Sequence, residues 1–389
     1  MKFTLALGSC LLALLPVLHG VTDAADSIPE FVLPEPPGPY AVRHSAFELV
    51  DTSRLDPFNA THFRRLMVTR FDPAEKVECR NLCHVHYMSP KFARLEDELL
   101  VPRGWVPGVL EAARLQSCCN GDGGNVEAIA AEMHRTYDNT KFPLLIYSPG
   151  GNTSRLQQSA LVQAVASRGY TILSVDHPYE VDLVEFPDGT VVPGGRVNFD
   201  ELNERIRSGS PSRAPRRHLW PLLRRRSSRA DDGHGSSRRG GMNLDGMQFG
   251  RVVQDGFGSS TVPQAFVLLG AVGHNSSDTG PYDPSWGQFW GKMHTPPHDG
   301  VWTREVSLAP AVHNSFTDYS LLVDTAGVRY RLSDHAKERM AGPLEGKRTM
   351  EILAAYVGDF YGFVLKGADE GLYKGPSGKF PEVSFLPYQ

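Results

Sequence analysis

Residues 142–178 begin with Phe142-Pro-Leu-Leu-Ile-Tyr-Ser-Pro-Gly-Gly151 and end with Tyr170-Thr-Ile-Leu-Ser-Val-Asp-His-Pro178. Leu144 to Tyr147 is a continuous apolar run, which is typical of a strand buried on both faces of a parallel sheet. Residues 157–168 have the apolar spacing of a helix, which Gly169 ends, and a second apolar run follows at 170–175. A strand, a helix and a strand in this order predict a βαβ unit and a doubly wound α/β sheet.

Further elements extend this unit in both directions along the chain of 389 residues. We predict strands at residues 41–50, 65–71, 264–269 and 305–308, and helices at 126–137 and 349–365. Residues 25–40 are rich in proline and are predicted to be an extended lead-in. Because no linker or fixed-period repeat divides the remainder, residues 41–389 are predicted to form one domain.

The first 24 residues have the pattern of a secretory signal peptide. Lys2 is followed by an apolar run from Phe3 to Leu18, and small residues at Thr22 and Ala24 suit cleavage after Ala24. The run is short for a membrane span, and no later segment approaches one. We therefore expect a soluble, exported protein, in agreement with three glycosylation sequons, at Asn59, Asn152 and Asn275. The net charge of −4 predicts no general attraction to nucleic acid.

Four cysteines remain after removal of the signal peptide: Cys79, Cys83, Cys118 and Cys119. An even number in an oxidising compartment indicates two disulfides, for which three pairings exist. The first two cysteines, with His84 and His86, would alternatively form a metal site. Since no second ligand pair has the spacing of a zinc site, disulfides are favoured and neither a metal nor a cofactor is expected.

Gly150 and Gly151 directly follow the first buried strand. In open α/β folds, ligands bind at the carboxyl ends of the strands, so the pair is predicted to lie at that edge. Glycine amides approach an oxyanion closely and would stabilise a tetrahedral acyl intermediate. Considered alone, however, such a pair is more often a plain turn between a strand and a helix.

Asp245 and His313 favour the catalytic interpretation of the glycine pair. Asp245 lies in a tight turn within Gly241-Met-Asn-Leu-Asp-Gly246, and His313 lies in a loop after the strand predicted at 305–308. An acid that precedes a histidine, each after a strand, follows the order of a serine-esterase triad on an α/β sheet. Most of the fourteen histidines must be structural, and only this context distinguishes His313.

Four segments resemble, in order and spacing, the secreted platelet-activating-factor acetylhydrolase family of α/β hydrolases: residues 142–151, 167–178, 243–246 and 312–318. The resemblance implies an α/β-hydrolase fold, with a mostly parallel central sheet and helices on both faces. It also implies hydrolysis of short sn-2 acyl groups of glycerophospholipids without a metal, and peripheral contact with a lipid surface. Asp245 would orient His313, the general base, and the backbone at Gly150 and Gly151 would contribute to the oxyanion hole. The family usually has a bulkier residue at position 151 and glycine at position 152.

The family's nucleophile elbow, Gly-x-Ser-x-Gly, does not occur in this sequence. It would fall between His177 and Asp245. Ser227 and Ser228 lie in that interval, but they lack the flanking glycines that the strained turn of an elbow requires. Residues 213–239 are instead rich in arginine and have neither the apolar period of a strand nor that of a helix. The nucleophile is therefore unknown.

A shifted reading frame offers an explanation for the missing elbow. With suitable synonymous codons, a shift of one nucleotide from Arg216 gives Val-Gly-Ile-Phe-Gly-His-Ser-Phe-Gly-Gly-Ala-Ala-Ala-Ala, a strand, an elbow and a helix. Its serine falls across the codons of Leu222 and Leu223, and Trp220 followed by Pro221 always gives glycine in that frame. We therefore interpret residues 216–239 as an out-of-frame reading, with the frame restored before Asn243.

Two other interpretations of the arginine-rich interval stay open, namely a genuine basic loop and a basic patch for anionic lipid. Two alternative functions also stay open for the chain. It would be a catalytically inactive, secreted lipid-binding protein, or a secreted esterase of another specificity, such as a broad carboxylesterase or a polyester hydrolase.

Overall fold

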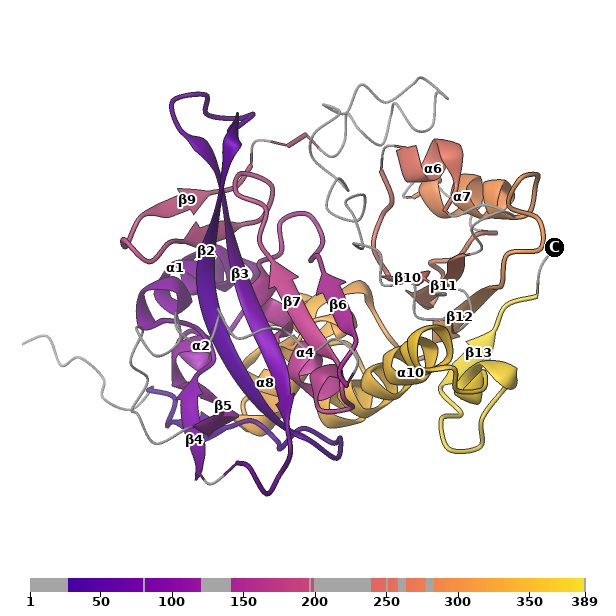
Figure 1. Cartoon of the computed structure of the whole chain (residues 1–389). Helices are drawn as coiled ribbons and strands as arrows, with labels where there is room; N and C mark the ends of the chain where they lie inside the picture. Colours follow the sequence, from indigo (N-terminus) through magenta and orange to yellow (C-terminus); the bar gives the residue numbers. More distant parts are fainter. Residues whose placement is uncertain are drawn as a thin grey trace, which may run out of the picture.

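The computed structural model describes residues 27–79, 81–119, 141–195, 197–198, 239–249, 251–257, 264–277 and 283–387. Helices pack around two four-stranded sheets, which gives an α/β architecture (Figure 1). The signal peptide predicted at 1–24, the helix predicted at 126–137 and all of the arginine-rich interval except residue 239 lie outside the described residues.

The first sheet has the strand order β2-β3-β7-β6 and contains the four strands predicted in the N-terminal half of the chain. They are β2 (Ala41–Leu55), β3 (Phe63–Ala74), β7 (Thr171–Val175) and β6 (Leu144–Tyr147). β2 and β3 form an antiparallel hairpin, and β3 is also antiparallel to β7. β6 and β7 are parallel, as the predicted βαβ unit requires.

The second sheet has the order β10-β11-β12-β13. Its strands are β10 (Arg239–Leu244), β11 (Gln264–Ala271), β12 (Thr303–Leu308) and β13 (Val383–Phe385). β10, β11 and β12 are parallel, and β13 returns antiparallel to β12. A single, mostly parallel central sheet is therefore not confirmed, since the described strands form two sheets of mixed direction.

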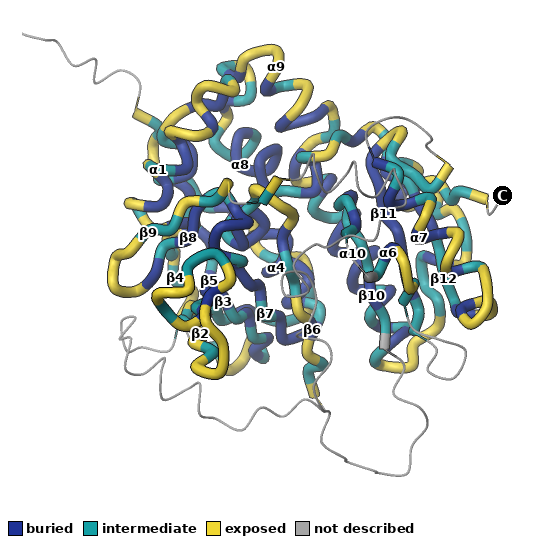
Figure 2. Tube along the Cα trace, turned by 90° about the horizontal axis from the view of Figure 1, so that it is seen from above, coloured by how far each residue is buried: buried dark blue, intermediate teal, exposed yellow. Residues whose placement is uncertain are grey.

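β6 and β10 are the end strands on the sides where the two sheets face each other (Figures 1 and 2). Among the described residues, each of them pairs with one strand only. The prediction that β6 is buried on both faces was wrong. Leu144 and Ile146 are 43% and 39% exposed, because only the face that carries Leu145 packs into the core.

One apolar core joins the two sheets. It contains Leu145 and Ile172 of the first sheet, Val267 and Val306 of the second, and residues of the helices α4 (Ser159–Ala166) and α10 (Gly346–Lys366). α10 contacts both α4 and β10. The helix predicted at 349–365 is thus a brace between the two halves of the molecule.

β11 is covered on both faces. Its residues Val267 and Leu269 enter the core beside α10, whereas Phe266 and Leu268 pack on the opposite side with the helices α6 (Arg251–Asp255) and α7 (Ser285–Met293). This alternation is the period of two expected of a strand with helices on both sides.

A third sheet, of order β1-β5-β4, is formed by N-terminal strands and packs with helices from both the N-terminal and the C-terminal parts of the chain. Two disulfides hold it, Cys79–Cys118 and Cys83–Cys119, with Cα atoms 5.4 and 5.8 Å apart, so the expectation of disulfides is confirmed. The elements of this region are β1 (Phe31–Val32), β4 (Asn81–His86), β5 (Ala113–Cys119), α1 (Pro90–Leu100), α2 (Val109–Ala112), α8 (Tyr319–Thr325) and α9 (Asp334–Ala336).

A small hairpin of β8 (Leu183–Glu185) and β9 (Val191–Pro193) follows the first sheet. Within the described ranges, no helix has the length and apolar character that crossing a bilayer requires.

Candidate active site

Asp245 lies in the turn that directly follows β10. Its backbone is left-handed, with φ of 56°, a conformation that aspartate tolerates better than most residues. Asn243 closes the turn by accepting a hydrogen bond from the Gly246 amide at 2.7 Å and donating one to the Gly246 carbonyl at 2.8 Å. The Asp245 carboxylate is directed inward and is only 1% exposed.

His313 begins a short 3-10 helix in the loop after β12. Its Nδ1 lies 2.7 Å from Asp245 Oδ2, so the structure brings together two residues that the sequence marked as a pair. The imidazole is 70% exposed, whereas its carboxylate partner is buried. When Nδ1–H donates to Asp245, a neutral ring has its lone pair on Nε2, the nitrogen that a general base uses.

The other oxygen of Asp245 has two partners. Oδ1 accepts a hydrogen bond from the Ala271 amide at 2.6 Å and lies 2.9 Å from Nδ1 of His274. Burial raises the pKa of Asp245, but the hydrogen bonds from His274 and His313 outweigh burial and lower it below its ordinary value. The carboxylate is therefore ionised at neutral pH.

His274 is a functional candidate that sequence reasoning missed. It follows β11, as His313 follows β12, and this shared position after a buried parallel strand was the available signal. Its Nε2 lies 2.8 Å from Asp283 Oδ2, and its ring centroid lies 4.1 Å from that of Trp286. Burial lowers the pKa of His274, but the hydrogen bonds to Asp245 and Asp283 outweigh burial and raise it to about 9.

Gly150 and Gly151 lie in the loop after the carboxyl end of β6. Asp245 and His313 likewise follow the carboxyl ends of their strands, β10 and β12. Neither glycine has a positive φ. The left-handed position is Asn152, with φ of 56°, where the family usually has glycine. The Asn152 amide donates to the Glu180 carbonyl at 3.0 Å. No described hydrogen bond links this loop to Asp245 or His313.

Ser148 lies at the start of the same loop, and its Oγ is 2.8 Å from Nε2 of His177. Within the described part of the chain, no hydroxyl or thiol forms a hydrogen bond with His313. Ser227 and Ser228 lie outside the described residues, as do residues 199–238 of the interval in which an elbow was expected.

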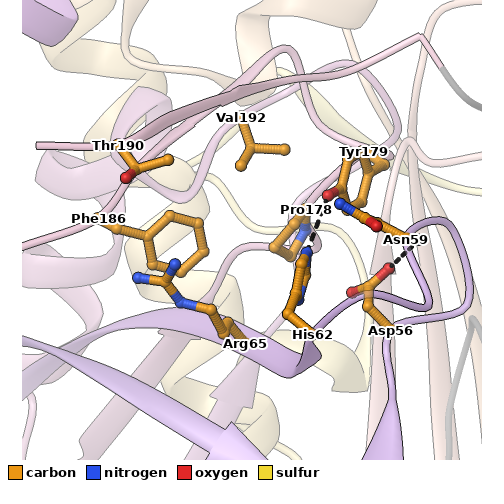
Figure 3. A pocket seen from close by; sticks show the side chains of 9 residues that line it. All are labelled: Asp56, Asn59, His62, Arg65, Pro178, Tyr179, Phe186, Thr190 and Val192. Carbon is orange, nitrogen blue, oxygen red and sulfur yellow. Dashed lines mark hydrogen bonds between the residues drawn. The ribbon is translucent and has the colours of Figure 1, made fainter. Parts of the chain in front are cut away.

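A cavity of about 190 Å³ lies beside the β2–β3 hairpin, between the loop after β7 and the β8–β9 hairpin (Figure 3). His62 and Tyr179 approach each other across it, with His62 Nε2 3.3 Å from the Tyr179 hydroxyl. Arg65 lies over the ring of Phe186. Since ordinary small-molecule sites have volumes of about 300 Å³ or more, we do not assign this cavity as a ligand site.

No protein-family model matches the chain, but known proteins and solved structures are similar to it. The chain is 36% identical, over 385 residues, to the "Probable 1-alkyl-2-acetylglycerophosphocholine esterase" of Arthroderma benhamiae, with 93% of this chain and 96% of that protein covered. The structure of this chain is similar to that of a ferulic acid esterase from Streptomyces cinnamoneus, with a TM-score of 0.64 and 23% sequence identity. The comparison covers 92% of this chain and 99% of the esterase. At that identity the similarity shows the fold alone.

Proposed function

Because the chain belongs to the family of 1-alkyl-2-acetylglycerophosphocholine esterases, the platelet-activating-factor acetylhydrolases, we propose that its site is built to hydrolyse short sn-2 acyl esters of such glycerophospholipids. The observation that carries this proposal is the 2.7 Å hydrogen bond between Asp245 and an exposed His313. A buried carboxylate that orients an accessible imidazole is the acid and base pair of a serine esterase.

The proposed reaction is a serine acyl-enzyme cycle. A serine hydroxyl attacks the sn-2 carbonyl carbon while Nε2 of His313 accepts its proton, and Asp245 stabilises the imidazolium that forms. When the tetrahedral intermediate collapses, the bond from the carbonyl carbon to the sn-2 oxygen breaks, and that oxygen takes the proton from His313, so that the lysophospholipid leaves as an alcohol. Water, activated by the same imidazole, releases the short acid from the serine. Backbone amides at Gly150 and Gly151 would stabilise the oxyanion.

We further propose that the chain in its present form lacks the nucleophile of this cycle. One feature of the sheets and one of the sequence support this. β6 and β10, which face each other, each have one described strand partner, and one parallel strand between them would give a single sheet of order β2-β3-β7-β6-x-β10-β11-β12-β13. The interval between β9 and β10 contains residues 213–238 of the arginine-rich stretch, where the family carries its elbow strand.

The exposure of β6 agrees with the same proposal. Leu144 and Ile146 project from the face of β6 that does not enter the core. In a continuous α/β sheet, a helix that follows the neighbouring strand would cover such a face. A serine elbow at the end of that strand would lie between the Gly150 loop and the Asp245 turn.

Sequencing of the transcript across residues 213–243 tests the reading-frame explanation. We expect a splice junction or a frame change that restores Gly-His-Ser-Phe-Gly. An unbroken message that encodes the arginines in frame would overturn this explanation and would leave the two alternatives, a secreted lipid-binding protein without activity and a secreted esterase of another specificity.

Hydrolysis of 4-nitrophenyl acetate tests the catalytic assignment. Two chains are compared, the present one and one in which the shifted-frame residues replace the arginine-rich interval. We expect activity in the second chain only, and its loss on His313→Ala but not on His335→Ala, since His335 is an exposed histidine of α9. Activity that survives His313→Ala would refute the assignment. A panel of sn-2 chain lengths separates a phospholipid acetylhydrolase from a broad carboxylesterase.

We also propose that the protein is exported and glycosylated. Two disulfides support an oxidising compartment, and none of the three sequon asparagines, Asn59, Asn152 and Asn275, is buried. Mass spectrometry of protein secreted from a eukaryotic host, before and after removal of N-glycans, checks both points. An intact residue 1 in the mature protein would contradict the export signal.

A further inference from the structure

His274 has a carboxylate at each of its ring nitrogens. Nδ1 is 2.9 Å from Asp245 Oδ1, and Nε2 is 2.8 Å from Asp283 Oδ2. An ionised carboxylate only accepts hydrogen bonds, and a neutral imidazole has a single N–H. Both contacts are hydrogen bonds only if both nitrogens carry protons. The geometry therefore requires His274 to be an imidazolium.

The surroundings of His274 favour the charged form. The Trp286 ring of α7 packs on one side of the imidazole, and the side chain is 19% exposed. A third carboxylate, Glu305 of β12, accepts hydrogen bonds from the amide and hydroxyl of Ser276, both at 2.5 Å, and interacts electrostatically with His274. The raised pKa of His274, about 9, agrees with this environment. Burial acts against the charged form, but the nearby negative charge outweighs it.

The contacts of Asp245 divide its two oxygens between two tasks. Oδ1 receives the Ala271 amide and the His274 ring, whereas Oδ2 receives His313. The first two contacts fix the plane of the carboxylate, because Ala271 is part of β11 and the His274 ring is held from its other side by Asp283. Oδ2 is thereby presented to His313 in one orientation.

We propose that His274 is a positioning residue of this site, an imidazole that stays protonated at neutral pH, that Asp283 anchors and that fixes Asp245 for His313. The proposal rests on the proposed function, since that function makes His313 the base. The four groups form a chain of alternating partners, His313, Asp245, His274 and Asp283. The positive charge of the imidazolium also partly compensates the negative charge of the Asp245 carboxylate. It therefore determines how strongly Oδ2 accepts the hydrogen bond from Nδ1–H of His313.

Nitrogen-15 NMR of the histidine rings tests the proposal on the full-length chain, without any need for catalysis. In the unsubstituted protein at pH 7, both ring nitrogens of His274 are expected to show the shifts of protonated nitrogens. In His274→Gln, the Nδ1–H resonance of His313 is expected to move downfield, because an uncompensated carboxylate accepts that hydrogen bond more strongly. His294→Gln is the matched control, since His294 also packs on a tryptophan, Trp290, and bonds to the Trp290 carbonyl and to Thr303.

A neutral ring pattern for His274 at pH 7 would overturn the proposal, and so would an unchanged His313 resonance in His274→Gln. If His274→Gln does not fold, Asp283→Asn replaces it, because this variant retains the imidazole and removes only its anchoring charge. The doubly protonated pattern is then expected to disappear at a lower pH than in the unsubstituted protein, and an unchanged titration of His274 in this variant would overturn the proposal. Failure of the proposed function would appear separately, as absent ester hydrolysis in the chain with the restored elbow.

Discussion

Asp245 and His313 are 68 residues apart in the chain, yet their side chains are 2.7 Å apart in the fold. The reason is the parallel register of β10, β11 and β12, in which Leu244 pairs with Leu269 and Ala271 pairs with Leu308. Residues that directly follow β10 and β12 must therefore emerge at one edge of the sheet. The buried strand β11 between them adds the Ala271 amide and His274, so three consecutive strand ends build one cluster.

Asp245→Asn should abolish most of the activity in the chain with the restored elbow. An amide in place of the carboxylate gives His313 the wrong partner for its Nδ1–H, and the equivalent change in serine proteases lowers kcat by roughly 10⁴-fold. Steady-state hydrolysis of 4-nitrophenyl acetate measures the effect. Asp334→Asn, at a side chain that is 96% exposed, is the control and should leave the rate unchanged. A loss below tenfold would argue against Asp245 as the orienting acid.

The stability of the protein should decrease above neutral pH because of His274. Its pKa is raised from 6.5 to about 9 in the folded state, so the folded protein retains a proton that the unfolded chain releases in that range. The stabilisation is complete below about pH 6.5 and is lost as the pH rises through about 9, and it amounts to roughly 3 kcal/mol at most. Urea unfolding at pH 6 to 9 should show this slope, and His274→Gln should remove it. Parallel curves for both proteins would contradict the prediction.

The left-handed backbone of Asn152 should make its two smallest replacements differ. Glycine adopts a φ of 56° without strain, whereas alanine in this region is destabilised by about 1 kcal/mol. Both variants remove the same sequon, so the difference between them in the free energy of unfolding isolates the backbone term. Urea denaturation measures that difference. Equal stabilities would show that Asn152 is not held in this conformation in solution.

Asp318 should be a stability residue, although it belongs to one of the segments that carry the family resemblance. It is fully buried and accepts hydrogen bonds from the amides of Ala160 and Leu161 and from the Tyr87 hydroxyl. Asp318→Ala leaves three buried donors without their acceptor and should cost about 3 kcal/mol or more, whereas Tyr87→Phe should cost about 1 kcal/mol. Thermal or urea unfolding distinguishes the two. Similar losses in both variants would mean that the amides find another acceptor.

The sequence was sufficient for six strands, β2, β3, β6, β7, β11 and β12, and for the pair Asp245 and His313, because apolar runs and the order of motifs are local properties of the chain. It was not sufficient for His274. Its partners, Asp245 and Asp283, stand 29 and 9 residues away, and only the register of β10 and β11 reveals that the three side chains meet. The exposure of Leu144 was missed for a related reason. An apolar run predicts a strand, but the burial of its faces depends on which elements are packed against it.

β6 also has a consequence for the fate of the molecule in the cell. Among the described residues it offers one unpaired edge, with Leu144 and Ile146 exposed beside it. A bare apolar edge is a template on which another chain can add a strand, and it promotes aggregation. Chaperones retain such polypeptides and proteases remove them. If, as proposed, the arginine-rich interval replaces the elbow strand, a transcript that encodes this form would lower the amount of protein released, whatever the activity of that protein.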